Sequence, residues 1–365
     1  MSYVNKGYCL DRLRKVRSLK GFSQQFLLGT MAGQKIFLYN ERIPRVMNIS
    51  FNEKTCMFAC KMCPFAEAEV REHYRSGSFM NFDTLKHLAA GVPNDSYYSF
   101  DISAIGETLA FEALPEFIAY MNKEKPLVNT IISTNGILLS EDLFLRLAHS
   151  GLDNIQVSLF AENQADHQKI TGTRSFEKVK TNLENIGRMK RERGLKKPFI
   201  QTFMIECQEN RQTSGHFVSY WSQFVDKAFI RPLYNVGREI EGMTPTFQKT
   251  PSPMRYPCIM PWYSTAVRST GEVLPCYVYH WHAQTWDQSI GNINAHSMEE
   301  IWQSDAFRKF RAAHLNVQLE DYPVCQKCDV WDAYTNVWEK RGNRFAYSPV
   351  GVRDLFLKAP AYRGG

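Results

Sequence analysis

The chain alternates between short runs suited to β-strands and longer runs with helical periodicity. Helical patterns such as 114–123 and 176–192 separate the strand-like runs. Those runs are rich in β-branched and aromatic residues and lie at 46–50, 98–104, 128–134, 154–160, 199–206 and 228–233. Such alternation predicts an α/β fold built from βα units, and six units fit a partial (β/α)6 TIM-like barrel. In barrels of this kind the chemistry collects at the carboxyl ends of the strands.

Three cysteines directly follow the first predicted strand. Cys56, Cys60 and Cys63 have the spacing C-x₃-C-x₂-C, and the fourth cysteine of a closed metal site is absent. A structural zinc site takes four ligands. A [4Fe–4S] cluster held by only three thiolates keeps one iron open, where a small chelating molecule can bind. The position after a barrel strand therefore predicts an active site.

Composition and charge exclude several other classes of protein. The chain has 365 residues, 44% of them hydrophobic, so it can bury a full core. Residues 1–20 carry scattered charge, and no apolar run approaches the roughly 18 residues that a membrane span needs. We therefore expect a cytoplasmic protein without a membrane partner. The net charge is +7, but the basic cluster at 188–197 falls at a predicted helix end, so we expect no nucleic-acid partner.

Nine cysteines in a reducing compartment indicate metal or redox chemistry rather than disulfides. Further motifs stand at the ends of the next predicted strands: Gly106 and Glu107 in AIGET, the segment STNG at 133–136, and Ser158 in QVSLF. Each alone is compatible with a turn, a hairpin or a buried hydroxyl. Together with the three cysteines, in register on successive strands, they resemble the radical S-adenosylmethionine (SAM) superfamily.

This resemblance implies that Cys56, Cys60 and Cys63 hold a [4Fe–4S] cluster that binds SAM. It implies that the Glu107 carboxylate holds the amino group of SAM. The family usually has an aromatic residue where this chain has Met62, and a thioether can take the same packing role on adenine. The expected SAM contacts are Met62, Gly106, Glu107, Ser133, Asn135 and Ser158.

A second group of cysteines lies in the last third of the chain. It comprises Cys258, Cys276, Cys325 and Cys328, and the segment before Cys276 predicts a hairpin that turns at 269–271. No further cysteine follows Cys328. The arrangement resembles the SPASM/Twitch extension of radical SAM enzymes and implies one auxiliary [4Fe–4S] cluster. Its spacing looks most like that of aminocyclitol dehydrogenases and aminoglycoside epimerases. A Cys₄ zinc ribbon is the alternative, although both of its knuckles usually have CxxC spacing.

The expected organisation has four parts. They are an N-terminal cap at 1–43, a radical SAM partial barrel at 44–240, a Twitch/SPASM domain at 241–335 and a tail at 336–365.

The resemblance implies an enzyme that reductively cleaves SAM to a 5′-deoxyadenosyl radical, with an electron donor such as flavodoxin or ferredoxin. We expect hydrogen abstraction from a hydroxylated small molecule of the sugar, aminocyclitol or nucleoside type, and oxidation through the auxiliary cluster. Arg231, at the end of the sixth predicted strand, is the expected substrate contact. Arg238, His280 and His282 are further candidates at the domain junction.

Three alternatives remain open. Cys207 follows the fifth predicted strand, where a thiol could return a hydrogen atom to the substrate and make the protein an epimerase. SPASM proteins also modify ribosomal peptides, which is the second alternative. The third, an electron carrier, would have no use for the GE and STNG motifs.

Overall fold

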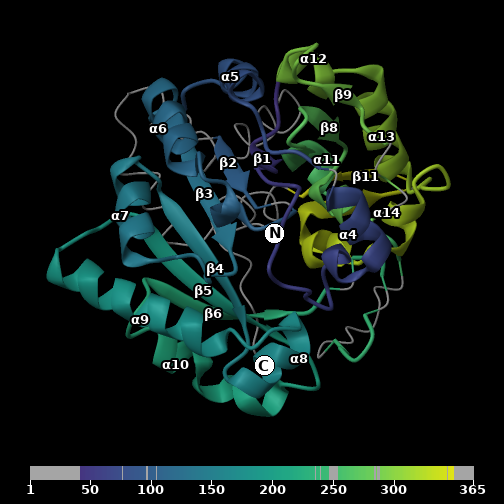
Figure 1. Ribbon diagram of the computed structural model, residues 1–365. Helices are drawn as coiled ribbons and strands as arrows, with labels where there is room; N and C mark the ends of the chain where they lie inside the picture. Colours follow the sequence, from purple (N-terminus) through teal and green to yellow (C-terminus); the bar gives the residue numbers. More distant parts are fainter. Residues whose placement is uncertain are drawn as a thin grey trace.

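The computed structural model describes residues 42–75, 77–95, 98–103, 105–234, 236–238, 240–245, 254–282, 285, 288–342 and 344–348. Within them, a nine-stranded sheet has the order β6-β5-β4-β3-β2-β1-β7-β8-β9 (Figure 1). The first six strands in the chain are parallel neighbours, which confirms the predicted partial barrel. They are β1 (Val46–Ile49), β2 (Ser99–Ile102), β3 (Asn129–Thr134), β4 (Asn154–Phe160), β5 (Phe199–Glu206) and β6 (Lys227–Pro232).

Helices follow the barrel strands and bury one apolar face each. Figure 1 shows α6, α7 and α9 beside the strands that they connect. Asn81, Ser140 and Asn163 start three of the helices, where each side chain accepts a hydrogen bond from a backbone N–H of the first turn. The helices are α4 (Ala68–Arg75), α5 (Phe82–Ala90), α6 (Leu114–Glu124), α7 (Glu141–His149), α8 (Gln164–Thr171), α9 (Phe176–Glu192) and α10 (Phe217–Trp221), with 3-10 turns η1 (Pro64–Ala66), η2 (Thr108–Ala110) and η3 (Arg211–His216).

Each barrel strand has one face under the helices and one face inside the barrel. In β2, Phe100 and Ile102 are fully buried in the main hydrophobic core. Successive side chains of a strand point to opposite faces, so Asp101 between them faces the barrel interior. Asn48 of β1 pairs with Asp101 and shares that face. The barrel interior therefore carries polar side chains, whereas the face under the helices is apolar.

The last third of the chain continues the barrel sheet. Strand β7 (Ser264–Val267) lies parallel to β1, and β8 (Glu272–Leu274) and β9 (Gly291–Asn292) extend it with antiparallel pairing. The hairpin predicted to turn at 269–271 is confirmed. Around it lie α11 (Met260–Tyr263), η4 (Tyr277–Trp281), α12 (Met298–Trp302), α13 (Asp305–Asn316), α14 (Pro323–Lys327) and η6 (Val330–Val337).

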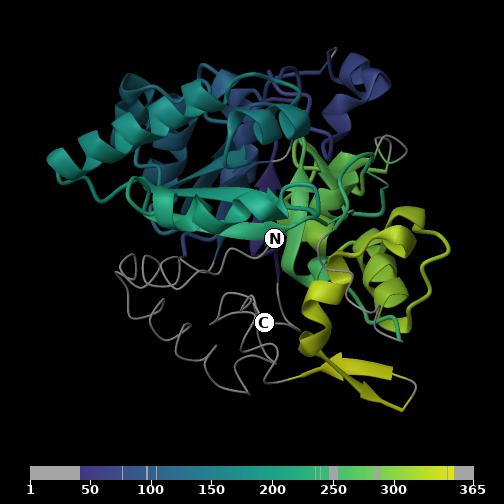
Figure 2. The same ribbon diagram turned by 90° about the horizontal axis from the view of Figure 1, so that it is seen from below.

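The chain after residue 336, expected to be a tail, contains a further hairpin. Strands β10 (Trp338–Arg341) and β11 (Arg344–Tyr347) pair antiparallel, and Figure 2 shows them at the edge of the molecule, away from the barrel strands. Trp338 of this hairpin packs edge-on against Trp262, with ring centroids 5.6 Å apart. The expected cap at 1–43 lies, except for its last two residues, outside the described residues. No helix in the described ranges is long and apolar enough to cross a membrane.

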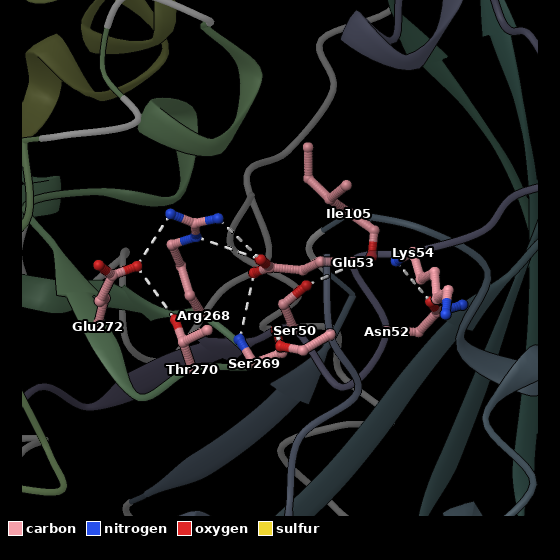
Figure 3. Close-up of polar contacts among 10 residues, drawn as sticks. Ser50, Asn52, Glu53, Lys54, Ile105, Arg268, Ser269, Thr270 and Glu272 are labelled. Atoms are coloured by element: carbon pink, nitrogen blue, oxygen red, sulfur yellow. Dashed lines mark hydrogen bonds and ion pairs between the residues drawn. The ribbon is translucent and has the colours of Figure 1, made fainter. Parts of the chain in front are cut away.

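A buried ion pair joins the turn of the β7–β8 hairpin to the loop after β1 (Figure 3). The guanidinium of Arg268 donates to Glu53 Oε2 through Nη2 at 3.1 Å and Nε at 3.2 Å, and it also binds Glu272. Glu53 is 1% exposed. Burial raises the pKa of its carboxyl group, while the charge of Arg268 opposes that shift. The backbone N–H of Ser269 completes the site, so this contact positions the second cysteine group relative to the first.

Candidate active site and iron–sulfur sites

The three-cysteine loop is held between α8 and the end of β2. Backbone N–H groups of Ala59 and Lys61 donate to the carbonyls of Thr171 and Ile170 at 2.9 Å. Burial raises the pKa of the Cys60 thiol well above its usual range, and the neighbouring thiols Cys63 and Cys56 raise it further. Cys56 and Cys63 pack against the same small apolar cluster as Cys60, so the three cysteine side chains lie in one region.

Glu107 lies fully inside the protein and binds the start of the STNG segment. Its carboxylate accepts hydrogen bonds from the backbone N–H of Asn135 at 2.8 Å, from the Thr134 hydroxyl and from Leu109 N at 3.0 Å. Burial raises the pKa of the Glu107 carboxyl group, and these hydrogen bonds oppose that shift. A hydrogen bond from the Asn135 side chain lowers the pKa of Cys56, which burial raises to about 12. The GE and STNG motifs thus meet beside the cysteine loop.

Gly106 has a backbone conformation that only glycine tolerates at this place. Its φ is +82°, and a Cβ atom there would lie 2.2 Å from the carbonyl oxygen of Asn52. The side chain of Asn52 also donates to the carbonyl of Glu107 at 2.8 Å. The close approach of these two backbones orients Glu107 toward β3.

Met62 and Cys207 belong to one small apolar cluster near the loop. Both are buried, together with Phe58, Cys60, Ala161, Ile170, Leu233 and Met243. Ser158 is half-buried at the end of β4, where the pairing with β5 shifts register before Phe160. Phe160 has a φ of 67°. Irregular strand ends of this kind are frequent next to active sites because they redirect side chains.

A polar ladder crosses the barrel interior from β3 to β6. Gln156 Nε2 donates to Ser133 Oγ at 3.2 Å, and its Oε1 accepts from Arg231 Nη2 at 3.0 Å. The guanidinium carbon of Arg231 lies 3.9 Å from the centroid of the Phe203 ring. Asp101 is also buried in the interior, and its Oδ1 has no hydrogen-bond partner in the described part of the chain. The barrel thus offers donors and acceptors suited to hydroxyl groups.

Cys207 is held as a protonated thiol. Burial raises the pKa of this thiol to about 11, and its hydrogen bond to Glu209 contributes to the shift. Burial alone would raise the pKa of Glu209, but hydrogen bonds from Thr244 and from Cys207 lower it to about 2. At neutral pH the pair is therefore a thiol that donates to a carboxylate.

The other four cysteines line one cavity between η4, α13 and α14. These cysteines belong to segments that are far apart in the chain and become neighbours only in the folded protein. They are Cys258, Cys276, Cys325 and Cys328. In the described ranges, no three His, Cys, Asp or Glu side chains converge closely enough to hold a single metal ion. Four thiols around a shared cavity fit the iron–sulfur cluster that the resemblance implies, because such clusters are held by four cysteine thiolates.

Arg238 lies at the junction of the two cysteine groups. It forms an ion pair with Glu67 and donates to the carbonyl of Trp281 at 3.3 Å. Burial lowers the pKa of Arg238, and the nearby Cys63 opposes that shift. Arg238 and His282 line a second cavity, separate from the four-cysteine one, and one ring nitrogen of His282 lies 2.9 Å from the carbonyl oxygen of Val236.

His280 is buried but is not among the residues that line the four-cysteine cavity. Three residues that belong to no motif of the sequence do line it, namely Arg255, Tyr279 and His314. Arg255 precedes Cys258 by three residues, which is a weak local signal. His314 lies within the amphipathic pattern of α13 and carries no such signal. Gln156 was missed as well, although its place within a buried strand marks it as a polar interior residue.

Comparison with known proteins identifies both halves of this arrangement. The Radical SAM superfamily model matches residues 54–201, and the iron-sulfur cluster-binding domain model, SPASM, matches residues 258–329. Together the two models cover more than half of the chain and include all seven clustered cysteines.

Individual relatives are more distant. A probable GTP 3′,8-cyclase of Methanococcus maripaludis is 31% identical over 140 residues, which are 38% of this chain and 44% of that protein. The chain therefore spans less than half the length of this relative. BtrN in complex with AdoMet and 2-DOIA has a TM-score of 0.50 at 18% identity, over 79% of this chain and 93% of that chain. The peptide complex of anSMEcpe with AdoMet and Cp18Cys has a TM-score of 0.52 at 17% identity, over 86% and 96% of the two chains. Both likenesses show a shared fold.

The fold and the two matched models make this chain a member of the radical SAM superfamily. Within that superfamily it carries a C-terminal SPASM-type iron–sulfur domain, so its cofactors are SAM and [4Fe–4S] clusters, as the sequence predicted.

Proposed function

We propose that this protein is an oxidoreductase that removes a hydrogen atom from a hydroxylated small molecule of the sugar, aminocyclitol or nucleoside type and oxidises it. The observation that carries the proposal is a polar barrel interior that contains Gln156 and Arg231, together with a second site of four thiols in the same chain. When bound, SAM and two clusters supply a 5′-deoxyadenosyl radical and an acceptor for one electron.

We assign Cys56, Cys60 and Cys63 to the SAM-binding cluster. Their proximity in one loop supports this assignment, because three thiols leave one iron without a protein ligand, and that iron can take both the amino and the carboxylate group of SAM. The auxiliary cluster is assigned to four thiols, which leave no position for a substrate. These four are Cys258, Cys276, Cys325 and Cys328.

We assign the Glu107 carboxylate as the acceptor of a hydrogen bond from the amino group of SAM. An ionised carboxylate has about four acceptor positions, and three protein donors already use Glu107. Gly106 presents its backbone to the same space, and Met62 offers an apolar surface for adenine. Ser133, Asn135 and Ser158, from the ends of β3 and β4, complete the proposed SAM contacts.

Arg231 is proposed to orient the substrate. Its guanidinium is already ordered by Gln156 and by the Phe203 ring, so little rotamer entropy is lost when it binds a hydroxyl group. Oxidation would balance as follows: the C–H hydrogen atom would go to the 5′-deoxyadenosyl radical that bound SAM supplies, the hydroxyl proton would go to water, and one electron would go to the auxiliary cluster as the ketone forms. An external donor such as flavodoxin or ferredoxin supplies the electron that cleaves SAM.

Epimerisation is the second candidate, and Cys207 is the observation that favours it. This thiol shares an apolar cluster with Cys60 and Met62, and it remains protonated at neutral pH. The protonated form is the one that can give a hydrogen atom to a carbon radical, and the thiyl radical left on Cys207 would be restored to the thiol by one electron from the auxiliary cluster and a proton from water. In that case the substrate would be inverted and its oxidation state would not change.

The test is a product analysis in deuterated water with reconstituted enzyme, SAM, a chemical reductant and a panel of aminocyclitols, sugars and nucleosides. A product two mass units lighter, formed equally by the Cys207→Ala variant, supports oxidation. Solvent deuterium on an inverted carbon, lost in Cys207→Ala, supports epimerisation instead. Turnover of none of these compounds, with modification of a peptide panel, would overturn the assignment to small molecules.

A further inference from the structure

Three polar side chains line the four-cysteine cavity without being thiols. Arg255 precedes α11, Tyr279 belongs to η4, and His314 lies in the last turn of α13. They come from separate parts of the domain and reach the same space. None of them is needed as a ligand, because four thiols are already present there.

His314 is a buried imidazole without a hydrogen-bond partner. The residue is 3% exposed, and neither ring nitrogen has a partner in the described part of the chain. Its ring packs edge-on against Phe310 with centroids 4.8 Å apart, which fixes its orientation at the cavity wall. A buried polar group left without a partner costs about 1–3 kcal/mol. A group in the cavity that accepts the imidazole N–H would remove this cost.

The imidazole of His314 is neutral at physiological pH. Burial lowers its pKa to about 3, and the positive charge of Arg255 contributes. A neutral imidazole carries one N–H donor. His314 can therefore donate one hydrogen bond into the cavity without adding a charge.

Tyr279 and Arg255 add a further hydrogen-bond donor and a positive charge to the surroundings of the four thiols. The Tyr279 hydroxyl lies 3.7 Å from Cys325 Sγ. Arg255 donates to the carbonyl of Cys325 at 2.8 Å and to that of Cys328 at 3.1 Å, and its guanidinium stacks on Trp331. These contacts hold a positive charge beside the segment that carries two of the thiols.

We propose that His314, assisted by Tyr279 and Arg255, donates a hydrogen bond to a sulfur atom of the auxiliary cluster and so raises the reduction potential of that cluster. Hydrogen bonds and positive charge stabilise the more negative, reduced form of an iron–sulfur cluster, and both are known means of tuning its potential. His314 would thus adjust the reduction potential of the cluster without being one of its ligands. The proposal rests on the proposed function only for the assignment of the four cysteines to this cluster, and it holds for any substrate.

The experiment measures the auxiliary cluster alone in the full-length chain. A background variant in which Cys56, Cys60 and Cys63 are all changed to Ala removes the SAM-binding site. Its remaining cluster is titrated with a chemical reductant and followed by absorbance and electron paramagnetic resonance. We expect His314→Phe to lower the equilibrium constant for one-electron reduction about tenfold, which is a potential about 59 mV lower.

Two further variants separate a hydrogen bond from a packing effect. His314→Gln keeps an N–H donor at a similar distance from the backbone and should restore most of the shift. His280→Phe is the matched control, because His280 is also buried, at 1% exposed, with both ring nitrogens unpartnered in the described ranges, yet it does not line the cavity. The control should leave the potential unchanged.

An unchanged potential in His314→Phe at full iron content overturns the proposal, and so does an equal shift in His280→Phe. If His314→Phe fails to bind iron, His314→Gln is compared with His314→Ala, and equal potentials in these two variants overturn the proposal. Absence of iron from the background variant itself would contradict the proposed ligand assignment instead, so the two failures are distinguishable.

Discussion

The two cysteine sites differ in how they are built and in the charges around them. Cys56, Cys60 and Cys63 come from one eight-residue loop, whereas the other four cysteines are spread over 258–328 and converge only through the fold. Burial raises the pKa of the thiols at both sites. Beyond burial, the Glu107 carboxylate raises the pKa of Cys56, while the Arg255 guanidinium lowers that of Cys325.

Both sites also have charge of the other sign nearby, because Arg238 and Arg71 lower the pKa of Cys63 and the Asp329 carboxylate raises that of Cys328. A carboxylate beside the three-thiol site disfavours additional negative charge there. Hydrogen-bond donors and a guanidinium beside the four-thiol site favour it. The feature that distinguishes the four-cysteine site is the set of polar side chains Arg255, Tyr279 and His314 that line its cavity.

The largest expected effect is the separate loss of each cluster. Reconstituted protein should bind about eight iron per chain, and changing Cys56, Cys60 and Cys63 together to Ala should leave about four and abolish SAM cleavage. Changing Cys258 and Cys325 to Ala should also leave about four, while reductive SAM cleavage continues. Iron analysis and 5′-deoxyadenosine formation measure these outcomes. Stoichiometric zinc in place of iron would contradict both assignments.

Breaking the contact between the two regions should have the next largest effect. Arg268→Ala leaves the Glu53 carboxylate buried without its partner, and such losses cost about 3–5 kcal/mol. We expect a correspondingly lower free energy of unfolding by chemical denaturation. The double variant Glu53→Leu with Arg268→Met removes both charges and should be clearly more stable than Arg268→Ala. Equal stability of Arg268→Ala and the native protein would show that this ion pair does not hold the regions together.

Glu107→Gln tests the role of the carboxylate beside the three-cysteine site. The substitution keeps the volume of the side chain but removes the charge proposed to pair with SAM. Loss of one charge-assisted contact should weaken SAM binding by roughly 1.5–3 kcal/mol, about ten- to a hundredfold, with unchanged iron content. Equilibrium binding of SAM measures this effect, and Glu112→Gln, at an exposed neighbouring position, is the control. An unchanged dissociation constant would place the amino group of SAM away from Glu107.

The smallest effect is expected at the other site. Tyr279→Phe removes a single hydroxyl 3.7 Å from Cys325 Sγ and leaves the packing intact. A neutral hydrogen bond contributes about 0.5–1.5 kcal/mol, so the reduction equilibrium of the auxiliary cluster should fall by less than about tenfold. Redox titration measures this shift in the variant whose Cys56, Cys60 and Cys63 are all changed to Ala. A rise in potential would show that the hydroxyl does not donate to the sulfur.

The barrel strands were predictable because their signal is local. Each is a short run of buried β-branched or aromatic residues, and the predicted and observed bounds differ by two residues at most. The three-cysteine loop was predictable for the same reason, since its spacing is contained in eight residues. The hairpin at 264–274 was predicted from its turn residues, but not its pairing with β1, which joins segments far apart in the chain.

The surroundings of the four-cysteine cavity were not predictable from the sequence. In the sequence, His314 occupies a core-facing position of the amphipathic helix α13, like any buried helix residue. Only the packing of α13 against the cysteines shows that its side chain lines their cavity. Glu53 and Arg268 are ordinary charged residues in sequence, and their pairing depends on the same long-range contact between β1 and β7. Contacts between residues far apart in the chain depend on the fold topology, and a local sequence pattern does not predict them.

The pairing of β1 with β7 also has a consequence for synthesis on the ribosome. Strand β1 emerges early, but its partner on one side begins at Ser264, so one edge of β1 stays open while most of the barrel is made. Translation proceeds at roughly 5–20 residues per second, so this exposed edge persists for on the order of ten seconds or more. Unpaired edges recruit other strands and promote aggregation. The nascent chain therefore passes through a period in which chaperone capture of β1 competes with misassembly, and this period ends only when the β7–β8 hairpin arrives.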